Sequence, residues 1–554
     1  MGQTLRRPSG RPKLPVADRQ PTVSLLSRAK FWLDRLRHDR SKVSAVEIVV
    51  YDVDPNSTVA LPTVSPVTLN SFETNRTYCN RNGLETPVRI VASEEIAETN
   101  TDTKALRIHI ANGVELAEHA VARLIEVFNE DPELQMAYTD AAGFGESNEA
   151  LLLPGFSPER LADQMYLGQL LAIRVGAELK LSEPSVVGSG RDRWDVLGTA
   201  VLKVSRVAHV PERLYRATAS AVTGATKRVR PESVVELGSE PMVSIIIPTC
   251  GARRDLLAGE VVLVEQAIRS VLERSSYSNY ELVVVTTPGT APDLPSRLHD
   301  LVADFSMRID VVRDDRPFNF SNACNRGAVT ASGQVLLFLN DDTEVLSTDW
   351  IQQLLHHALQ PEIGAVGAKL TYENGTVQHN GIWCRGGHPV HRYEGSPDGG
   401  GYLQALDVTQ NCLAVTGACL AVERSKFVAA GGFSPIFPNS YNDVDLCLKL
   451  LDLGWRTVVE PRARLSHYEA STRDPVINGE DMARLHDRWR WRLNHDPFDN
   501  PAHQAALSEE LPLPSGVNEF SSAAERLSPR LWPLDPMVNP ASDLVNKVGP
   551  AVGR

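Results

Sequence analysis

The sequence predicts an α/β protein whose second half contains a mainly parallel sheet with helices on both faces. Apolar runs at Val243–Pro248 and Gln334–Leu339 are typical of strands that are buried on both faces of a sheet. Between them, Glu260–Glu273 has the periodicity of an amphipathic helix. Strands that alternate with helices indicate parallel pairing, because a parallel connection has to cross over the sheet.

The other elements of this half continue the alternation. Further strands are predicted at Glu281–Val285, Arg308–Val312 and Thr457–Val459. Further helices are predicted at Asn322–Ala331, Asp445–Leu453 and Asp481–Leu493. Ligands of such sheets bind at the carboxyl ends of the strands. We therefore expect one rim to carry the polar residues that follow these strands, namely Thr249, Thr286, Asp314, Asp341 and Asp342.

The length of 554 residues predicts more than one domain, since single cores rarely grow far beyond about 300 residues. The first half mixes strands at Val46–Tyr51 and Arg107–Ile110 with a helix at Glu118–Phe128. A polar linker at Thr226–Pro241 separates it from the second half. The expected domains are residues 1–45 (a disordered tail and a basic helix), 46–235 (α/β), 241–475 (α/β) and 476–554 (a helix and a peripheral tail).

Composition argues against several classes of protein. No apolar run approaches the roughly 18 residues that cross a bilayer, and the start lacks the apolar core of a signal peptide. The 7 cysteines show neither paired metal spacing nor a disulfide framework, so we expect a cytoplasmic protein. The net charge of -13 argues against nucleic-acid binding.

Residues 25–42 have the pattern of an amphipathic helix rich in Arg and Lys. Such a helix can lie on an anionic membrane surface, which would place the protein peripherally at the inner face of the membrane. The alternative is a helix that docks on its own protein, as most amphipathic helices do.

Asp341 and Asp342 directly follow the apolar run Val335–Leu339. Carboxylates at the carboxyl end of a buried strand are well placed to hold a divalent metal and the phosphate that it neutralises. The alternative is ordinary turn chemistry, because Asn and Asp are frequent where a strand ends.

Asp443 and His467 extend this candidate site. Asp443 opens a helix, where it could serve only as a favourable charge, and a lone histidine is usually a structural residue. Taken together, Asp342 and His467 would supply an oxygen and a nitrogen ligand for Mn²⁺ or Mg²⁺. Asp443 could accept a proton from an attacking hydroxyl. Metal, diphosphate and base are what a direct displacement of a nucleotide from a sugar requires.

Residues 241–475 resemble a family 2 glycosyltransferase of the GT-A fold, a nucleotide-sugar-binding α/β fold. The segments that carry the resemblance are Val243–Thr249, Phe318–Gly327, Leu337–Glu344, Val366–Leu370, Val415–Cys419 and Asn442–Lys449, followed by His467. Asp496–Pro501 also resembles a segment found after the catalytic domain in bacterial members that build surface polysaccharides. The resemblance implies a metal-dependent, inverting reaction and favours a rhamnosyl donor.

The family's site residues are carried over to the matching positions. By resemblance they are the metal ligands Asp342 and His467, the catalytic base Asp443, and the donor contacts Thr249, Asp341, Gly417 and Ala418. Asn340 takes the first place of the metal motif. The segment Gln378–Gly381 resembles a family element on the acceptor side, to which no further role is assigned.

Thr286 departs from the family pattern, in which the second strand usually ends in an aspartate that reads the nucleotide base. A threonine hydroxyl can donate or accept a hydrogen bond but lacks the charge and reach of a carboxylate. Uridine and thymidine therefore both remain candidate nucleosides. The Gln-x-x-Arg-Trp motif and the membrane spans of processive polymerases are missing, which favours the addition of one or few sugars.

The first half resembles a degenerate copy of the same fold. A constant shift along the chain places Ala111 and Asn112 at the two aspartates of the metal motif. A slightly larger shift aligns Pro211 with Pro461 and places Ala217 at the metal histidine. Such a degenerate copy would serve in packing, acceptor binding or dimerisation. The alternative is chance similarity between two α/β domains.

The sequence therefore predicts a metal-dependent, inverting glycosyltransferase. It would move a sugar from a nucleotide-diphosphate donor to a hydroxyl of a cell-surface glycan or lipid-linked acceptor. One alternative is a non-catalytic nucleotide-sugar-binding or scaffold protein of a glycan assembly complex. Another is a nucleotidyltransferase, which would need a Gly-rich, basic phosphate loop; Cys250–Arg254 is only a weak candidate for one.

Overall fold

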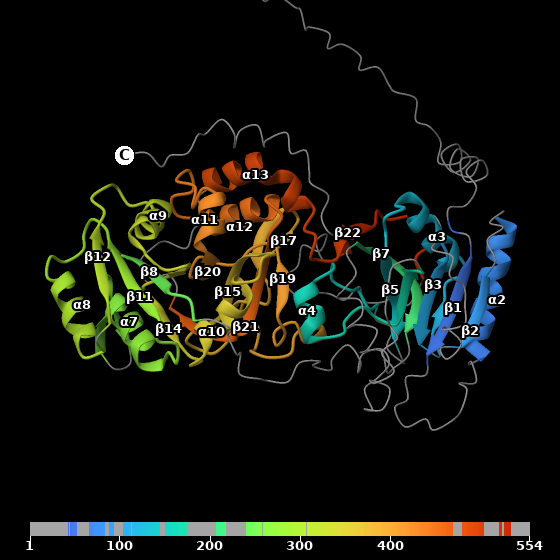
Figure 1. The fold of residues 1–554 in the computed structure, drawn as a ribbon, viewed down its shortest axis with the longest axis horizontal. Coiled ribbons are helices and arrows are strands. Elements are labelled where there is room, and N and C mark those ends of the chain that lie inside the picture. The colour runs from blue at the N-terminus through green and yellow to red at the C-terminus, as the bar shows by residue number, and fades with distance from the viewer. Residues whose placement is uncertain are drawn as a thin grey trace, which may run out of the picture.

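A computed structural model describes most of both halves of the chain. The described residues are 43, 45–51, 66–82, 88–92, 104–111, 113–144, 150–175, 206–217, 240–256, 259–305, 307–468, 479–502, 520–522 and 526–532. Within them, each half of the chain builds a sheet of its own, and the two sheets lie next to each other (Figure 1). The predicted N-terminal tail, the basic helix 25–42 and nearly all of the predicted linker lie outside the described residues.

The sheet of the second half carries the predicted rim. Its strands, in spatial order, are β12 (Ile309–Arg313), β11 (Tyr280–Thr286), β8 (Val243–Thr249), β13 (Val335–Leu339), β20 (Cys419–Glu423), β15 (Ile363–Thr371), β21 (Arg456–His467) and β14 (Thr343–Val345). The first four are parallel, so their carboxyl ends share one edge, as predicted. Beyond β13 the sheet is mixed, with β20 antiparallel to both of its neighbours and β15 parallel to β21.

Two short strands extend this sheet, and two hairpins lie apart from it. β16 (Val377–His379) pairs with β15, and β19 (Gln410–Cys412) pairs with β21. Two separate hairpins are formed by β9 (Arg253–Leu256) with β10 (Gly259–Val262), and by β17 (Ile382–Arg385) with β18 (His388–His391). A 3-10 turn, η3, spans Tyr402–Gln404.

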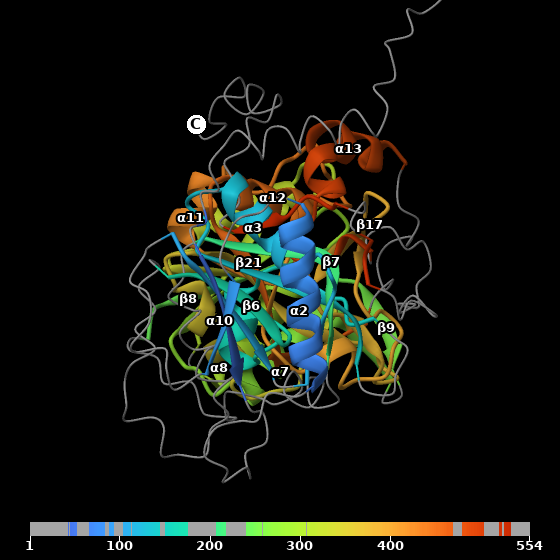
Figure 2. The same ribbon diagram turned by 90° about the vertical axis from the view of Figure 1, so that its right-hand side faces the viewer.

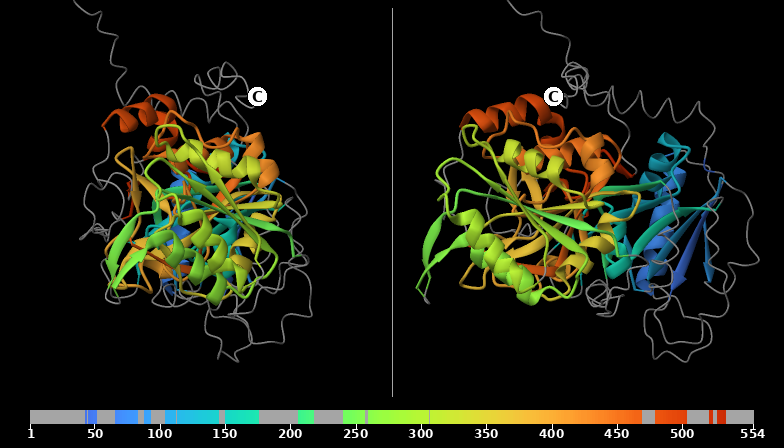
Figure 3. Two further views of the ribbon diagram at one scale, coloured as in Figure 1. Left: turned by 90° about the vertical axis from the view of Figure 1, so that its left-hand side faces the viewer. Right: turned by 60° about the vertical axis from the view of Figure 1, so that its left-hand side comes forward.

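Helices cover both faces of this sheet (Figures 1 and 3). One face is covered by α7 (Leu263–Arg274), α8 (Leu294–Ala303) and α10 (Trp350–Ala358). The other is covered by α9 (Phe320–Thr330), α11 (Arg424–Ala429), α12 (Asn442–Asp452) and α13 (Gly479–Asn494). Ile246 and Ile247 of β8 belong to different cores, because successive side chains of a strand point to opposite faces. The predicted α/β class with flanking helices is confirmed.

Three elements differ from the prediction by three residues or more at one end. The helix expected from Glu260 begins at Leu263, because the residues before it pair in the β9–β10 hairpin. The helix expected from Asp445 begins at Asn442. The strand expected at Thr457–Val459 continues as β21 to His467.

The first half builds the second sheet (Figure 2). Its strands, in spatial order, are β2 (Val88–Ala92), β1 (Val46–Tyr51), β3 (Leu106–Ala111), β6 (Leu170–Arg174), β5 (Met136–Phe144), β7 (Val207–Ala217) and β22 (Arg530–Trp532), while β4 (Glu115–Leu116) pairs with β7. α2 (Pro66–Arg81) and α3 (Ala120–Glu130) lie in contact with each other and pack into its core. β22 comes from the predicted C-terminal tail, which thus returns to the first half.

The two sheets share a strand order. β1, β2, β3, β4, β5, β6 and β7 take the places of β8, β11, β13, β14, β15, β20 and β21, with the same parallel and antiparallel neighbours. Ala111 and Ala217 end β3 and β7, the counterparts of the strands that lead to Asp341 and His467. Asn112 lies outside the described residues, as does Arg193, which the larger shift aligns with Asp443. The shared order supports the interpretation of the first half as a copy.

Polar contacts join the two halves at α4 (Pro158–Asp163), which lies between the sheets in Figure 1. Asp163 accepts hydrogen bonds from the Thr409 backbone N–H at 3.0 Å and from its hydroxyl at 2.7 Å. Arg462 donates to the same carboxylate at 3.1 Å. Glu159 pairs with Arg456 at 2.5 Å. These groups are mostly buried, so the first half is an integral part of the folded chain.

The Asp496–Pro501 segment is a second connection between the halves. The Phe498 carbonyl accepts from the Gly155 backbone N–H at 3.1 Å, and a Cβ on Gly155 would lie 1.9 Å from the Pro497 carbonyl oxygen. Asn500 donates to the Asp140 carboxylate at 2.8 Å. Only glycine therefore permits this close approach of the two backbones.

Candidate active site

The ends of β8 and β13 bring Thr249 and Asp341 together. The Thr249 hydroxyl donates to Oδ2 of Asp341 at 2.6 Å, and both side chains are buried. Burial and the adjacent Asp342 carboxylate raise the pKa of Asp341 to about 7, against the lowering effect of the Thr249 hydrogen bond. These two predicted donor contacts therefore form one fixed polar unit at the rim.

Asp342 and His467 meet through the pairing of β14 with β21. Thr343 lies opposite His467 in this antiparallel pair, and the Tyr468 backbone N–H donates to the Asp342 carbonyl at 2.9 Å. Nε2 of His467 lies 3.0 Å from Oδ1 of Asp342. The two side chains predicted to bind the metal are therefore adjacent, although far apart in sequence.

Asp342 and His467 suit a cation that takes most of its ligands from water and substrate. Nowhere in the described ranges do three or more His, Cys, Asp or Glu side chains form a group able to hold a metal ion. Asp342 and His467 offer one oxygen and one nitrogen, which lie 3.0 Å apart. Mg²⁺ and Mn²⁺ commonly take one or two protein ligands and complete their shell with water and substrate phosphates. The residues present fit such a metal.

Asp443 lies in the first turn of α12 and faces the loop before β20. Its Oδ2 accepts from the Gly417 backbone N–H at 2.8 Å, and its Oδ1 accepts from Val444 N–H at 2.8 Å. The neighbouring Ala418 carbonyl accepts from the Asn340 backbone N–H at 3.0 Å. The predicted base is thereby linked through Gly417 and Ala418 to the metal motif.

Thr286 ends β11 directly opposite Thr249, as the rim prediction requires. Its hydroxyl donates to the Val312 carbonyl at 3.4 Å, and its side chain is buried. Asp314 directly follows the next strand, β12, and its carboxylate accepts from both Nε and Nη2 of Arg316 at 2.8 and 2.6 Å. These hydrogen bonds lower the pKa of Asp314. A carboxylate is thus present on this side of the rim, one strand further out.

Asp445 has a structural position. It is fully buried and accepts from Nε1 of Trp489 at 2.9 Å, while Arg488 lies 3.2 Å from the same carboxylate. The Asp445 side chain therefore connects α12 to α13. Its contacts differ from those of Asp443, which faces the loop before β20. In the weak phosphate-loop candidate, Arg253 pairs with Glu260 at 2.7 Å and Arg254 pairs with Glu373 at 2.6 Å.

Two contacts at the metal side have no direct sequence signal. Nδ2 of Asn340 lies 3.2 Å from Nε2 of His467, and Oε1 of Gln378 lies 2.8 Å from Nδ1 of the same ring. Gln378 belongs to the segment that resembles a family element without an assigned role. The sequence singled out Gln378 only as a member of that segment, because its partner His467 is 89 positions away in sequence.

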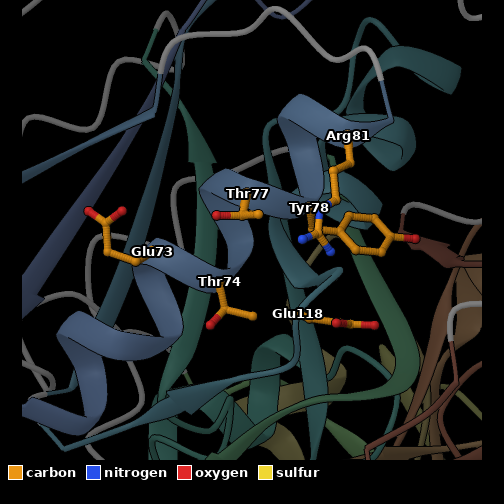
Figure 4. A pocket seen from close by; sticks show the side chains of 6 residues that line it. All are labelled: Glu73, Thr74, Thr77, Tyr78, Arg81 and Glu118. Carbon is orange, nitrogen blue, oxygen red and sulfur yellow. The ribbon is translucent and has the colours of Figure 1, made fainter.

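A surface pocket in the first half is separate from this site (Figure 4). It lies along α2 and is lined by Glu73, Thr74, Thr77, Tyr78, Arg81 and Glu118. All the predicted site residues lie in the second half, so this pocket is no part of the candidate active site.

The parallel rim, the paired carboxylates and the facing histidine are arranged as expected for the predicted nucleotide-sugar site. Residues 244–427 match the model of the family described as Glycosyl transferase family 2. Residues 244–427 thus form a glycosyl transferase family 2 domain, and the family resemblance predicted for the second half is confirmed.

Relatives extend the similarity beyond that domain. The chain is 31% identical over 428 residues to the O-antigen biosynthesis protein RfbC of Myxococcus xanthus, which covers 70% of this chain and 33% of that protein. It is 28% identical over 497 residues to the uncharacterized protein y4gI of Sinorhizobium fredii (strain NBRC 101917 / NGR234), which covers 79% of this chain and 53% of that protein. The chain thus spans a third to a half of these relatives.

Solved structures give a weaker likeness. GalNAc-T7 with UDP, GalNAc and Mn²⁺ is 16% identical at a TM-score of 0.37, over 46% of this chain and 49% of that one. The mannosyltransferase PcManGT of Pyrobaculum calidifontis with GDP-Man and Mn²⁺ is 16% identical at a TM-score of 0.31, over 47% and 65%. Both TM-scores are low, so the assignment of the site rests on the family domain and on the geometry of the rim.

Proposed function

We propose that this chain transfers a sugar from a nucleotide-diphosphate donor to a hydroxyl of a cell-surface glycan or lipid-linked acceptor, with inversion. The observation that carries the proposal is the Asp443 carboxylate, which is held by two backbone N–H groups on the same rim as Asp342 and His467. The relative named for O-antigen biosynthesis supports a surface glycan as the acceptor.

Asp443 is the proposed base. Each of its oxygens accepts one backbone N–H, which fixes the carboxylate and leaves each oxygen with a further lone pair. A fixed carboxylate can take the proton of an acceptor hydroxyl as that oxygen attacks the sugar carbon. Because attack and departure occur on opposite faces in one displacement, the configuration at that carbon inverts.

Asp342 and His467 are the proposed ligands of Mn²⁺ or Mg²⁺. When bound, such a cation neutralises the charge that develops on the leaving diphosphate. Thr249 and Asp341 are the proposed contacts of the nucleoside and ribose, with Thr286 beside them. Gly417 and Ala418 are proposed to line the donor sugar, because their loop joins the base to the metal motif.

The first half is proposed to be a degenerate copy that supports the catalytic half by packing. Its strand order and its buried contacts through α4 support this role. The counterpart of Asp341 is Ala111 and that of His467 is Ala217, so the copy lacks these two groups of the site.

Peripheral membrane contact from the cytoplasmic side is proposed for residues 25–42. None of the helices in the described ranges is both long and apolar enough to cross a membrane. Deletion of residues 1–45 is expected to release the protein from anionic vesicles, measured by flotation. Equal flotation of the full chain and the deletion variant would contradict this contact.

A panel of nucleotide sugars with Mn²⁺ tests the proposed reaction. Binding is measured by calorimetry, and hydrolysis or transfer by release of the nucleoside diphosphate. Binding of one donor with turnover supports a transferase. Binding without turnover with any acceptor favours the alternative, a nucleotide-sugar-binding scaffold protein. No binding of any donor in the presence of metal rejects both.

A further inference from the structure

β16 lies between the metal side and the base side of the candidate site. Its neighbouring residues Gln378 and His379 are buried and point to different partners. Gln378 contacts the ring of His467, whereas Nε2 of His379 accepts from the Thr416 backbone N–H at 3.3 Å. Thr416 directly precedes Gly417, so this short strand is held from both sides of the site.

The orientation of the Gln378 amide follows from its second contact. Its Nε2 donates to the backbone carbonyl of His467 at 3.4 Å, and a carbonyl can only accept. The other end of the amide, Oε1, must then be the atom that faces Nδ1 of His467 at 2.8 Å. Since Oε1 also only accepts, Nδ1 carries the proton.

This hydrogen bond determines what the other ring nitrogen presents. In a neutral imidazole with the proton on Nδ1, Nε2 has a free lone pair. Nε2 lies 3.0 Å from Oδ1 of Asp342 and 3.2 Å from Nδ2 of Asn340. In this neutral form the lone pairs of His467 and Asp342 would face each other, an arrangement that a shared cation would favour.

We propose that Gln378 is a positioning residue that fixes His467 in the tautomer and ring orientation needed to bind the metal. This inference rests on the proposed metal site of the transferase. Metal-binding histidines usually donate their second ring N–H to an oxygen, which raises their basicity as ligands. Gln378 supplies that oxygen from β16, and its amide contacts the ring and the backbone of His467.

The test measures Mn²⁺ binding by the full chain without any nucleotide sugar. Free Mn²⁺ is titrated by electron paramagnetic resonance, and pulsed measurements detect nitrogen coupling from a histidine ligand. Gln378→Met keeps the length of the side chain but removes the acceptor, and we expect its Mn²⁺ affinity to fall about 10–100-fold with loss of the nitrogen coupling. Gln378→Glu retains an acceptor and should bind within about threefold of the wild type.

Controls separate positioning from a general loss of structure. Gln353→Met removes another buried glutamine, which bonds Asp349 on α10, and should leave both readouts unchanged. Gln378→Asn keeps the amide but shortens its reach, so it should show the same loss of affinity and coupling, and it replaces Gln378→Met if that variant fails to fold. Wild-type affinity and coupling in Gln378→Met or Gln378→Asn overturn the inference. Absence of Mn²⁺ binding by the wild type itself rejects the metal assignment of the proposed function.

Discussion

Pro211 in β7 and Pro461 in β21 lie at matching irregularities of two parallel strand pairs. β7 shifts its register against β5 directly after Val210, and β21 shifts against β15 directly after Glu460. Proline has no backbone N–H to donate, so it is tolerated where a strand is locally out of register. A shared irregularity within a shared strand order favours duplication over chance similarity.

Asp163→Ala is expected to lower the free energy of unfolding of the full chain by about 2–4 kcal/mol, because it leaves buried groups without their acceptor. Those groups are the Thr409 N–H and hydroxyl and the Arg462 guanidinium, all in the other half. Urea denaturation followed by circular dichroism measures the change. Asp300→Ala, at an exposed position within α8, should change it by less than about 0.5 kcal/mol. Equal stability of both variants would show that the halves do not depend on this contact.

Asp443→Asn is expected to lower kcat by about 10²–10⁴-fold while leaving donor affinity unchanged. The carboxamide oxygen can still accept from the Gly417 N–H, whereas the NH2 group cannot accept from the Val444 N–H, and the amide cannot take a proton from the acceptor. Product formation with the best donor of the panel and calorimetric donor binding measure the two effects. Asp452→Asn at the far end of α12 is the matched control and should retain turnover. Unchanged transfer by Asp443→Asn would remove the base assignment.

The rim could be predicted from the sequence because its strands are apolar runs that end in polar residues. The full length of β21 could not, since Arg462 and Arg464 interrupt its apolar pattern. Those arginines are paired with Glu460 at 2.6 Å and with Asp398 at 2.5 Å, and the second pairing spans a large separation in sequence. The role of Gln378 was hidden for the same reason, because its contact with His467 depends on tertiary structure.

Chelation of divalent cations by EDTA is expected to stop turnover and to leave the fold intact. The backbone around Asp342 and His467 is held by the β14–β21 pairing and by the Tyr468 N–H, so the site keeps its framework without a metal. Activity should return with Mn²⁺, and the melting temperature should shift by less than about 2 °C. Turnover that persists in EDTA would argue against the assigned roles of Asp342 and His467.

Protonation of Asp496 is expected to make the junction of the halves more stable at acidic than at neutral pH. Burial and the nearby Asp499 carboxylate raise the pKa of Asp496 to about 7, against the lowering effects of the Phe498 and Cys384 N–H groups and of Arg530. An acid whose pKa is higher in the folded than in the unfolded state stabilises the fold while it is protonated. This contribution is complete below the unfolded pKa, near 4, and is lost as the pH rises towards 7.

Asp496→Asn mimics the protonated carboxyl and removes this titration. Between pH 4.5 and 8, ionisation of Asp496 should lower the unfolding free energy of the wild type by about 2–4 kcal/mol. Asp496→Asn lacks this contribution, so its unfolding free energy should fall by about 2–4 kcal/mol less than that of the wild type over the same range. Urea denaturation at several pH values measures both slopes. Asp310→Asn, a change at an exposed carboxylate, should follow the wild-type curve. Parallel curves for the wild type and Asp496→Asn would mean that Asp496 is already ionised in the folded chain at acidic pH, held by Arg530.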